Sequence, residues 1–276
     1  MTVAHEQSRA SAAGDFLARI AAHKRDELAR RVAARPLDAV RAAAEAMPPP
    51  RDFRGALAGP APRLIAEIKR VSPAKGELNV GLSPATMART YEGGGAHALS
   101  VLTDERFFHG SDDDLAEARG AVALPVLRKD FVISPYQVYE ARALGADAVL
   151  LIAALLPPAK LIELHALATG LGLAALVEVH DRSEVEPALA AGATLVGINN
   201  RNLATFAVDL AATEAVCPLL PAGVTVVSES GIATASDVRR AVTAGASAIL
   251  VGEALVTAAD PAARIGQLLG AVACSS

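Results

Sequence analysis

The sequence predicts an α/β protein, a single closed (β/α)₈ barrel of the TIM type preceded by a helical N-terminal extension. Beyond residue 63, eight short apolar stretches typical of buried strands alternate with helical stretches. Near-continuous apolar strands separated by helices indicate a parallel sheet with both faces covered, and eight such units favour a closed barrel. No G-x-G-x-x-G fingerprint follows any strand, which disfavours an open doubly wound sheet.

The extension precedes the first strand. Residues 1–14 are small and polar, and we expect them to be loose. Across residues 15–35 apolar side chains recur at helical spacing among Lys and Arg, which predicts an amphipathic helix. A second short helix is expected over residues 37–47, where three prolines end it. We therefore assign residues 1–47 to the extension and 48–276 to the barrel, as one structural domain overall.

The barrel strands and helices follow in alternation. The expected strands are residues 64–70, 98–103, 125–131, 148–154, 174–180, 195–200, 225–230 and 248–252. Ser83-Pro84 and Ser134-Pro135 each read as an N-cap followed by proline at the first helical position. Glycine is expected to end helices, at Gly93, Gly145, Gly192 and Gly245.

A short pattern recurs before every second strand. It consists of a glycine, two small or polar residues and then a buried strand, and it begins at Gly95, Gly145, Gly192 and Gly245. This spacing predicts a unit of two βα pairs that is repeated around a closed structure.

Composition excludes several functional classes. The chain has 276 residues, and 52% of them are hydrophobic, enough for a large core. With 26 basic and 30 acidic residues the net charge is -4, and no basic stripe suits a nucleic acid. The two cysteines, Cys217 and Cys274, are too few for a disulfide framework or a metal site. Neither a signal pattern nor an apolar run long enough to span a bilayer occurs, so we expect a cytoplasmic protein without membrane contact.

Polar residues gather at the expected C-terminal ends of the strands, where barrel enzymes place their active sites. Alternation along each strand points these residues inward: Glu67, Lys69, Ser100, Leu127, Lys129, Leu150, Glu178, Asn199, Ser228 and Ser230. Glu67 and Lys69 alone are equally consistent with a structural ion pair. Two Glu, two Lys and an Asn at one mouth are hard to explain by packing, which favours Val, Ile and Leu. The set therefore indicates an active site.

The last two strands predict a phosphate site. Residues 228–232 and 251–253 follow the seventh and eighth strands, where barrels hold phosphates, and both loops contain glycine. Glu253 is a weak member of this site, because a carboxylate cannot donate a hydrogen bond to phosphate and only its backbone N–H could help. The histidines lack metal-ligand spacing, and we expect His23, His97, His165 and His180 to be surface or turn residues. The run of residues 112–114 is expected to start a helix.

Six motifs in order resemble those of the indole-3-glycerol-phosphate synthase family. They are residues 65–76, 100–104, 127–131, 176–180, 197–203 and 228–232. The resemblance runs from about Phe16 to the last helix. It implies a tryptophan-biosynthesis enzyme that closes the pyrrole ring of 1-(2-carboxyphenylamino)-1-deoxy-D-ribulose 5-phosphate with loss of carbon dioxide and water. It also implies that the helical extension packs over the barrel mouth.

The resemblance assigns catalytic roles to particular residues. Lys129 would be the general acid that protonates the substrate ketone as the aromatic carbon attacks it. Glu178 would stabilise the cationic intermediate, and Glu67 with Lys69 would serve the later dehydration and rearomatisation. Asn199 and Arg201 would orient the substrate, and Ser230 would complete the catalytic group. No cofactor and no metal are expected, because loss of carbon dioxide restores aromaticity without an electron sink.

Substrate binding is expected from a second group of residues. It comprises Ser72, Phe108, Phe131, Leu150, Arg201, Gly231, Gly252 and Glu253, with Ser230 beside the substrate. Phe107, Phe108 and Phe131 would give the aryl ring an apolar wall, although each alone is equally consistent with an ordinary core aromatic. The expected partner is a small phosphorylated molecule.

Two other functions stay open from the sequence. One is a related phosphate-binding barrel enzyme such as a phosphosugar isomerase, which would need an acid/base pair but not both Lys69 and Lys129. The other is a non-catalytic barrel that binds a phosphorylated metabolite, and the set of paired acids and bases argues against it.

Overall fold

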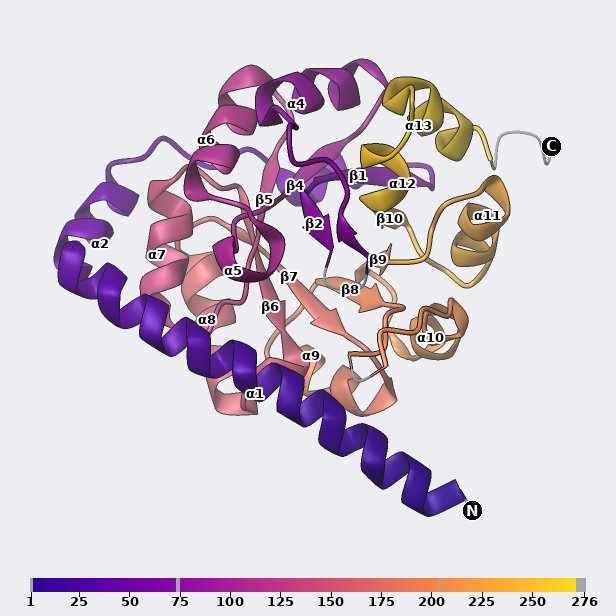
Figure 1. Ribbon diagram of the computed structural model, residues 1–276, viewed down its shortest axis with the longest axis horizontal. Coiled ribbons are helices and arrows are strands. Elements are labelled where there is room, and N and C mark those ends of the chain that lie inside the picture. Colours follow the sequence, from indigo (N-terminus) through magenta and orange to yellow (C-terminus); the bar gives the residue numbers. More distant parts are fainter. Residues whose placement is uncertain (1, 73–74, 204, 272–276) are drawn as a thin grey trace.

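The computed structural model of the chain describes residues 2–72, 75–203 and 205–271. For residues 2–16 it describes the backbone alone. Eight parallel strands close into a barrel in the order β1-β10-β9-β8-β7-β6-β5-β4 (Figure 1). The strands are β1 Arg63–Ile68, β4 Ala98–Leu102, β5 Val126–Lys129, β6 Ala148–Ile152, β7 Ala174–Val179, β8 Leu195–Asn199, β9 Thr225–Glu229 and β10 Ala248–Val251. The predicted closed (β/α)₈ barrel is confirmed, and each expected strand is present.

Helices surround the barrel and cover the outer face of the sheet (Figure 1). They are α4 Pro84–Gly93, α6 Asp112–Ala121, α7 Pro135–Ala143, α8 Pro158–Gly170, α9 Val185–Ala190, α10 Ala211–Val216, α11 Ala235–Thr243 and α13 Pro261–Leu269. Short elements lie in the loops: α5 Glu105–Phe108, α12 Glu253–Val256, and the 3₁₀ turns η1 Ala153–Leu155, η2 Arg182–Glu184 and η3 Cys217–Leu219.

The predicted helix signals are present at most positions. Ser83 and Ser134 each accept a backbone N–H at the start of α4 and α7, with proline in the first turn. The recurring glycines at 95, 145, 192 and 245 all have positive φ, the left-handed conformation in which glycine has no steric penalty. Gly93, by contrast, is still helical, so the left-handed residue after α4 is Gly95.

The extension consists of α1 Thr2–Ala34 and α2 Leu37–Glu45. Residues 2–14 are helical, so the expectation that they are loose is wrong, while Met1 lies outside the described residues. In Figure 1, α1 is one long rod that passes the barrel mouth and projects beyond it at its N-terminal end. Next along the chain comes α3 Phe53–Ala56, which with Leu57 packs against the inner apolar cluster of the barrel.

A small hairpin not expected from the sequence lies between β1 and α4. Its strands are β2 Val71–Ser72 and β3 Gly76–Glu77, which pair antiparallel. Pro73 and Ala74, two of the three residues between these strands, lie outside the described residues.

The barrel interior has an apolar layer beneath the mouth. It contains Ile65, Ala98, Leu127, Ala148, Leu176, Leu195, Val227 and Ala248, all of them buried. Inward residues are predicted for seven of the strands, and β9 is the one that departs from the expected alternation. Val227 faces inward, and Ser228 faces the helices, where its hydroxyl contacts Asn200 and Thr213. The prediction of an inward Ser228 is therefore wrong.

Two smaller observations complete the fold. Cys217 is buried and has no disulfide partner within the described residues, and Cys274 lies outside them. Within the described part of the chain, no helix combines the length and the apolar character needed to cross a membrane.

Candidate active site

A cavity of about 1000 Å³ opens at the C-terminal ends of the barrel strands. Most of the site residues predicted from the sequence line it: Glu67, Lys69, Ser72, Phe108, Lys129, Phe131, Leu150, Glu178, Asn199, Arg201, Ser230, Gly231, Gly252 and Glu253. Four other residues of the predicted set, Ser100, Phe107, Leu127 and Ser228, do not line it. The strands supply the deepest of these side chains, because parallel strands end at the same edge of the barrel. Leu17 of α1 also lines the cavity, so the extension reaches the mouth.

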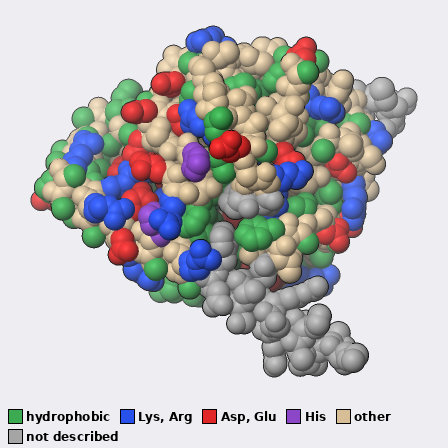
Figure 2. All heavy atoms as spheres, viewed as in Figure 1, with side chains coloured by type: hydrophobic (Ala, Val, Ile, Leu, Met, Phe, Trp, Pro, Cys, Tyr) green, Lys and Arg blue, Asp and Glu red, His purple; other side chains and the backbone are tan. Residues whose placement is uncertain are grey.

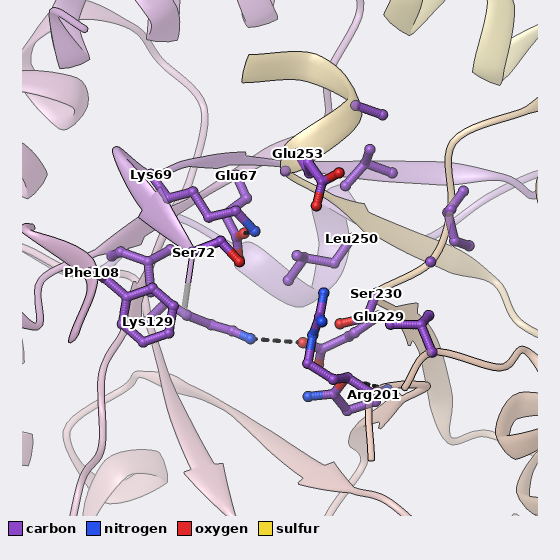
Figure 3. Close-up of a pocket in the computed structure, with 18 of the residues that line it drawn as sticks. Glu67, Lys69, Ser72, Phe108, Lys129, Arg201, Glu229, Ser230, Leu250 and Glu253 are labelled. Carbon is purple, nitrogen blue, oxygen red and sulfur yellow. Dashed lines mark hydrogen bonds and ion pairs between the residues drawn. The ribbon is translucent and has the colours of Figure 1, made fainter. Parts of the chain in front are cut away.

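Lys129 ends β5 and points toward the middle of the cavity (Figure 3). Its Nζ lies 2.9 Å from Glu229 Oε2 and 3.3 Å from Glu178 Oε2. Burial alone would lower the pKa of Lys129, but these two carboxylates outweigh it and hold that pKa above its ordinary value. An inward ammonium with two acceptors is thus fully charged and positioned to meet an anion or a carbonyl oxygen.

Glu178 of β7 is held by three neighbours. Burial raises the pKa of a carboxyl group, but Lys129 and His180 outweigh burial here, so the pKa of Glu178 is lowered and the group stays ionised. His180 Nε2 lies 3.3 Å from Glu178 Oε1, and His180 Nδ1 lies 3.2 Å from Glu184 Oε2. Asn199 also hydrogen-bonds Glu178. These contacts fix the direction of the carboxylate.

His180 therefore differs from expectation. Its side chain is only 12% exposed and is wedged between two carboxylates. Burial lowers its pKa, but Glu178 and Glu184 more than compensate and raise the pKa of His180 to about 10. The prediction of a surface or turn role is wrong for this histidine.

Glu229 is the site residue that sequence reasoning missed. It ends β9, is buried, and accepts the shorter of the two Lys129 contacts. Burial, together with the nearby Glu178 and Glu67, outweighs Lys129 and raises the pKa of Glu229 to about 7. The expected alternation had placed its two serine neighbours inward instead. Ser230 still lines the cavity, because its positive φ of 65° breaks the alternation.

Glu67 and Lys69 form the second charged group. Lys69 Nζ donates to Glu67 Oε1 over 2.6 Å. Burial raises the pKa of Glu67, but Lys69 and Lys129 outweigh burial and lower it. A Cβ at Gly252 would lie 2.3 Å from Glu67 Oε1 and 3.0 Å from Lys69 Nζ. Glycine at position 252 is thus what leaves room for this pair.

The opposite wall is built from the loops after β8 and β9. Asn199 Oδ1 accepts the backbone N–H of Arg201 over 3.0 Å, and Arg201 Nη1 donates to the carbonyl of Phe206 over 3.2 Å. Gly231 has φ of 79°, and a Cβ there would lie 2.4 Å from Val208 Cγ1. Both the left-handed backbone and the close contact therefore require glycine at 231.

The rim and the apolar wall complete the cavity. Glu253 at the rim pairs with Lys75 over 2.5 Å, so its negative charge is compensated. The ring centroids of Phe108 and Phe131 are 6.2 Å apart and both rings line the cavity. Phe107 packs edge-on against Phe131 and against His23 of α1, outside the lining. The run at 112–114 starts α6 as expected, capped by Ser111.

Comparison with known proteins identifies the family. A family model described as indole-3-glycerol phosphate synthase matches residues 17–268. An indole-3-glycerol phosphate synthase from Azoarcus sp. (strain BH72) is 51% identical over 93% of this chain and 99% of that protein. The one from Polaromonas sp. (strain JS666 / ATCC BAA-500) is 50% identical over 93% and 98%.

A solved structure shows the likeness of fold at much lower identity. The thiamine phosphate pyrophosphorylase from Pyrococcus furiosus superposes with a TM-score of 0.59 at 18% identity, over 80% of this chain and 98% of that one. This similarity concerns the barrel fold alone, whereas the family model and the relatives at about half identity span nearly the whole chain. The chain therefore belongs to the indole-3-glycerol phosphate synthase family.

Proposed function

We propose that the cavity carries out the indole-3-glycerol phosphate synthase reaction on 1-(2-carboxyphenylamino)-1-deoxy-D-ribulose 5-phosphate. The observation that carries this proposal is Lys129, a largely buried ammonium held by Glu229 and Glu178 at the centre of the cavity. A carbon nucleophile that attacks a ketone needs a proton at the developing alkoxide. A positioned ammonium both donates that proton and stabilises the charge.

The bonds of the reaction can be followed against the side chains. The ring carbon that bears the carboxylate attacks the ketone carbon, and the alkoxide takes a proton from Lys129. Carbon dioxide then leaves with its bonding electrons returned to the ring, and loss of water completes the indole. One carbon–carbon bond forms and one breaks, water is eliminated, and no external oxidant or reductant is consumed.

Glu178 is placed to stabilise the positive charge that develops on the ring and its nitrogen during the attack. It keeps its own negative charge because Lys129 and His180 lower its pKa. The side-chain amide of Asn199 hydrogen-bonds Glu178 and would fix the substrate relative to that carboxylate. A fixed, ionised carboxylate that is buried, as Glu178 is, stabilises a developing positive charge more than the same group in solvent.

Glu67 and Lys69 are the acid/base pair we assign to the dehydration. Loss of water needs a proton delivered to the leaving hydroxyl and another removed from the neighbouring carbon. The two groups lie 2.6 Å apart, so a proton can pass between them. Glu229, which the sequence did not single out, contacts Lys129 and has a pKa of about 7, so in its protonated form we expect it to donate a proton back to Lys129 after each turnover.

Substrate binding follows the shape of the cavity. Phe108 and Phe131 form the apolar wall that suits the aryl ring. We assign the phosphate to the loops that contain Gly231 and Gly252, with Arg201 and Lys69 supplying positive charge. Ser72, Leu150, Ser230 and Glu253 would contact the substrate between these ends, with Glu253 acting through its backbone. A small phosphorylated molecule is thus the proposed partner, and we expect the reaction to take place in the cytoplasm.

The test is incubation of the purified chain with this substrate while indole fluorescence and released carbon dioxide are both measured. We expect the two signals to rise together in equal amounts. A phosphosugar isomerase would release no carbon dioxide, and a binding protein would change neither signal. Either of those results would overturn the proposal.

A further inference from the structure

Lys24 is the buried point of contact between the extension and the cavity. It lies on α1, and its side chain is 1% exposed. Its Nζ lies 2.7 Å from Asp130 Oδ1, 2.8 Å from Asp104 Oδ2 and 3.0 Å from Glu27 Oε2. A lysine buried to this degree is stable only when paired, and here two of its three partners are themselves buried and belong to the barrel.

The first partner, Asp104, holds the short helix that presents Phe108. Asp104 lies two residues beyond the end of β4, and its Oδ1 accepts the backbone N–H of Phe107 over 2.6 Å, which caps α5. Its backbone carbonyl accepts the N–H of Gly110 on the far side of the same helix. The position of α5 is therefore fixed through Asp104, and Asp104 through Lys24.

The second partner, Asp130, stands between Lys129 and Phe131 in the sequence. Its Oδ1 also accepts the N–H of Phe131 over 2.7 Å, and its Oδ2 accepts the hydroxyl of Thr103 over 2.7 Å. Burial raises the pKa of Asp130, but Lys24 and Arg128 outweigh it and lower that pKa to about 2. The carboxylate thus remains ionised and tied to Lys24 across the working pH range.

We propose that Lys24 is a positioning residue for ring closure, acting through Asp104 and Asp130 on Phe108, Lys129 and Phe131. The inference rests on the function proposed above and names a part of the extension that this function requires. The Lys24 ammonium contacts the segment after β4, which leads to Phe108, and the residue directly after β5, which lies between Lys129 and Phe131. Placement errors of about 1 Å can cost a large factor in rate, so a residue with no contact to substrate can still control turnover.

The competing explanation is that Lys24 only anchors α1. Arg31 tests this, because it anchors the same helix two turns further along. It pairs with Asp112 over 2.6 Å and with Glu140 over 2.9 Å, on helices outside the barrel. Figure 2 shows acidic and basic side chains mixed on this side of the molecule. Neither Arg31 nor these two partners lines the cavity.

The experiment compares Lys24→Met with Arg31→Met in the full chain, with kcat, KM and thermal unfolding measured for both. We expect both variants to unfold at lower temperature. Lys24→Met should lower kcat/KM about ten-fold or more at a temperature where it is folded, and Arg31→Met should stay within about two-fold. Equal kinetic effects in the two variants, or a Lys24→Met variant that loses only stability, would overturn the proposal.

Two further variants keep the test decisive. If Lys24→Met does not fold, Asp104→Asn replaces it, because the amide oxygen can still cap α5 while the charge that holds Lys24 is gone. An unchanged kcat/KM in Asp104→Asn would overturn the proposal. In a Phe108→Ala background we expect Lys24→Met to lower kcat/KM by a smaller factor than it does in the parent chain. If the two substitutions instead lower kcat/KM independently, Lys24 does not act through α5 and Phe108. A parent chain that forms no indole would refute the proposed function itself, which separates the two failures.

Discussion

The barrel interior has two layers that lie on the same strands and the same face but differ in character. Beneath the mouth the inward residues are apolar, and two residues further along they are charged. The pairs are Ile65 and Glu67, Leu127 and Lys129, Leu176 and Glu178, and Val227 and Glu229. A step of two residues is about 6.6 Å along a strand, so packing and chemistry are separated by a single repeat of the strand.

The difference shows what each layer contributes. Burial of the apolar side chains stabilises the barrel, by about 1.5–3 kcal/mol for each large one. The charged layer cannot be explained in this way, because burying an ion costs free energy that its partner regains only in part. The ions of this layer persist as mutually paired groups: Lys129 with Glu178 and Glu229, and Lys69 with Glu67. Variants in one layer should therefore affect turnover, and variants in the other should affect stability.

The largest effect is expected at Lys129. Lys129→Met should lower kcat by about 10²–10⁴, the usual contribution of general acid catalysis, while the substrate still binds. Steady-state kinetics and calorimetric titration of substrate into the variant measure the two quantities. The neighbour Arg128 points the other way and pairs with Asp112 and Glu140.

Arg128→Met is the control for that prediction. It should lose up to about 3–5 kcal/mol of stability, because Asp112 and Glu140 then keep only Arg31, and Asp130 keeps only Lys24, as cationic partners. Its turnover should stay within a few-fold when it is folded. If Arg128→Met were the inactive variant and Lys129→Met the active one, both the strand orientation and the mechanism would fail.

A smaller loss is expected at Gly252. The methyl group of Gly252→Ala would displace Glu67 and Lys69, which lie 2.3 Å and 3.0 Å from that position, so we expect kcat to fall about ten-fold. Gly266→Ala in α13 is the matched control, since nothing lies within 4 Å of its Cβ position. Equal activity of the two variants would show that the Glu67–Lys69 geometry is not required.

The apolar layer is expected to respond in the opposite sense. Leu127→Ala should lower the free energy of unfolding by about 2–5 kcal/mol, because it leaves a cavity in a closely packed layer. Its turnover should stay within about three-fold at a temperature where the variant is folded. Chemical denaturation and kcat measured on one preparation provide the comparison, and a large loss of kcat without a loss of stability would remove the distinction between the layers.

The smallest effect is a pH dependence from Glu229. Its pKa of about 7 in the folded chain lies above its ordinary value of 4.5, so the folded state holds this proton more tightly than the unfolded state. Stability should therefore fall as pH rises from about 4.5 to 7, and Glu229→Gln should flatten this slope. Urea denaturation of parent and variant at several pH values measures it. Identical slopes would mean that Glu229 is ionised throughout.

Most of the fold and part of the site can be predicted from the sequence. Glycine spacing and alternating strands predict the closed barrel, and polar residues at the strand ends predict the cavity lining. The inward face of β9 is predicted wrongly because Val226 and Val227 are both apolar, so the two faces of this strand look alike in sequence. The left-handed backbone at Ser230 then lets both Glu229 and Ser230 reach the cavity, which alternation alone cannot predict.

Long-range charge pairs are the other feature that the sequence does not reveal. Lys24 meets Asp104 and Asp130, which lie far along the chain, and nothing local marks any of the three as partners. His180 likewise resembles an ordinary residue after a strand, until the fold places it between Glu178 and Glu184. Such contacts depend on how α1 and the loops pack, and only the three-dimensional structure provides that information.

The most direct test of the two layers is the ratio of turnover numbers of Leu127→Ala and Lys129→Met. The two positions lie on one strand and one face, so differences in local folding are kept small. Both kcat values are measured with saturating substrate at a temperature where both variants are folded. We expect Leu127→Ala to turn over at least about 100-fold faster than Lys129→Met. A ratio near one would contradict it.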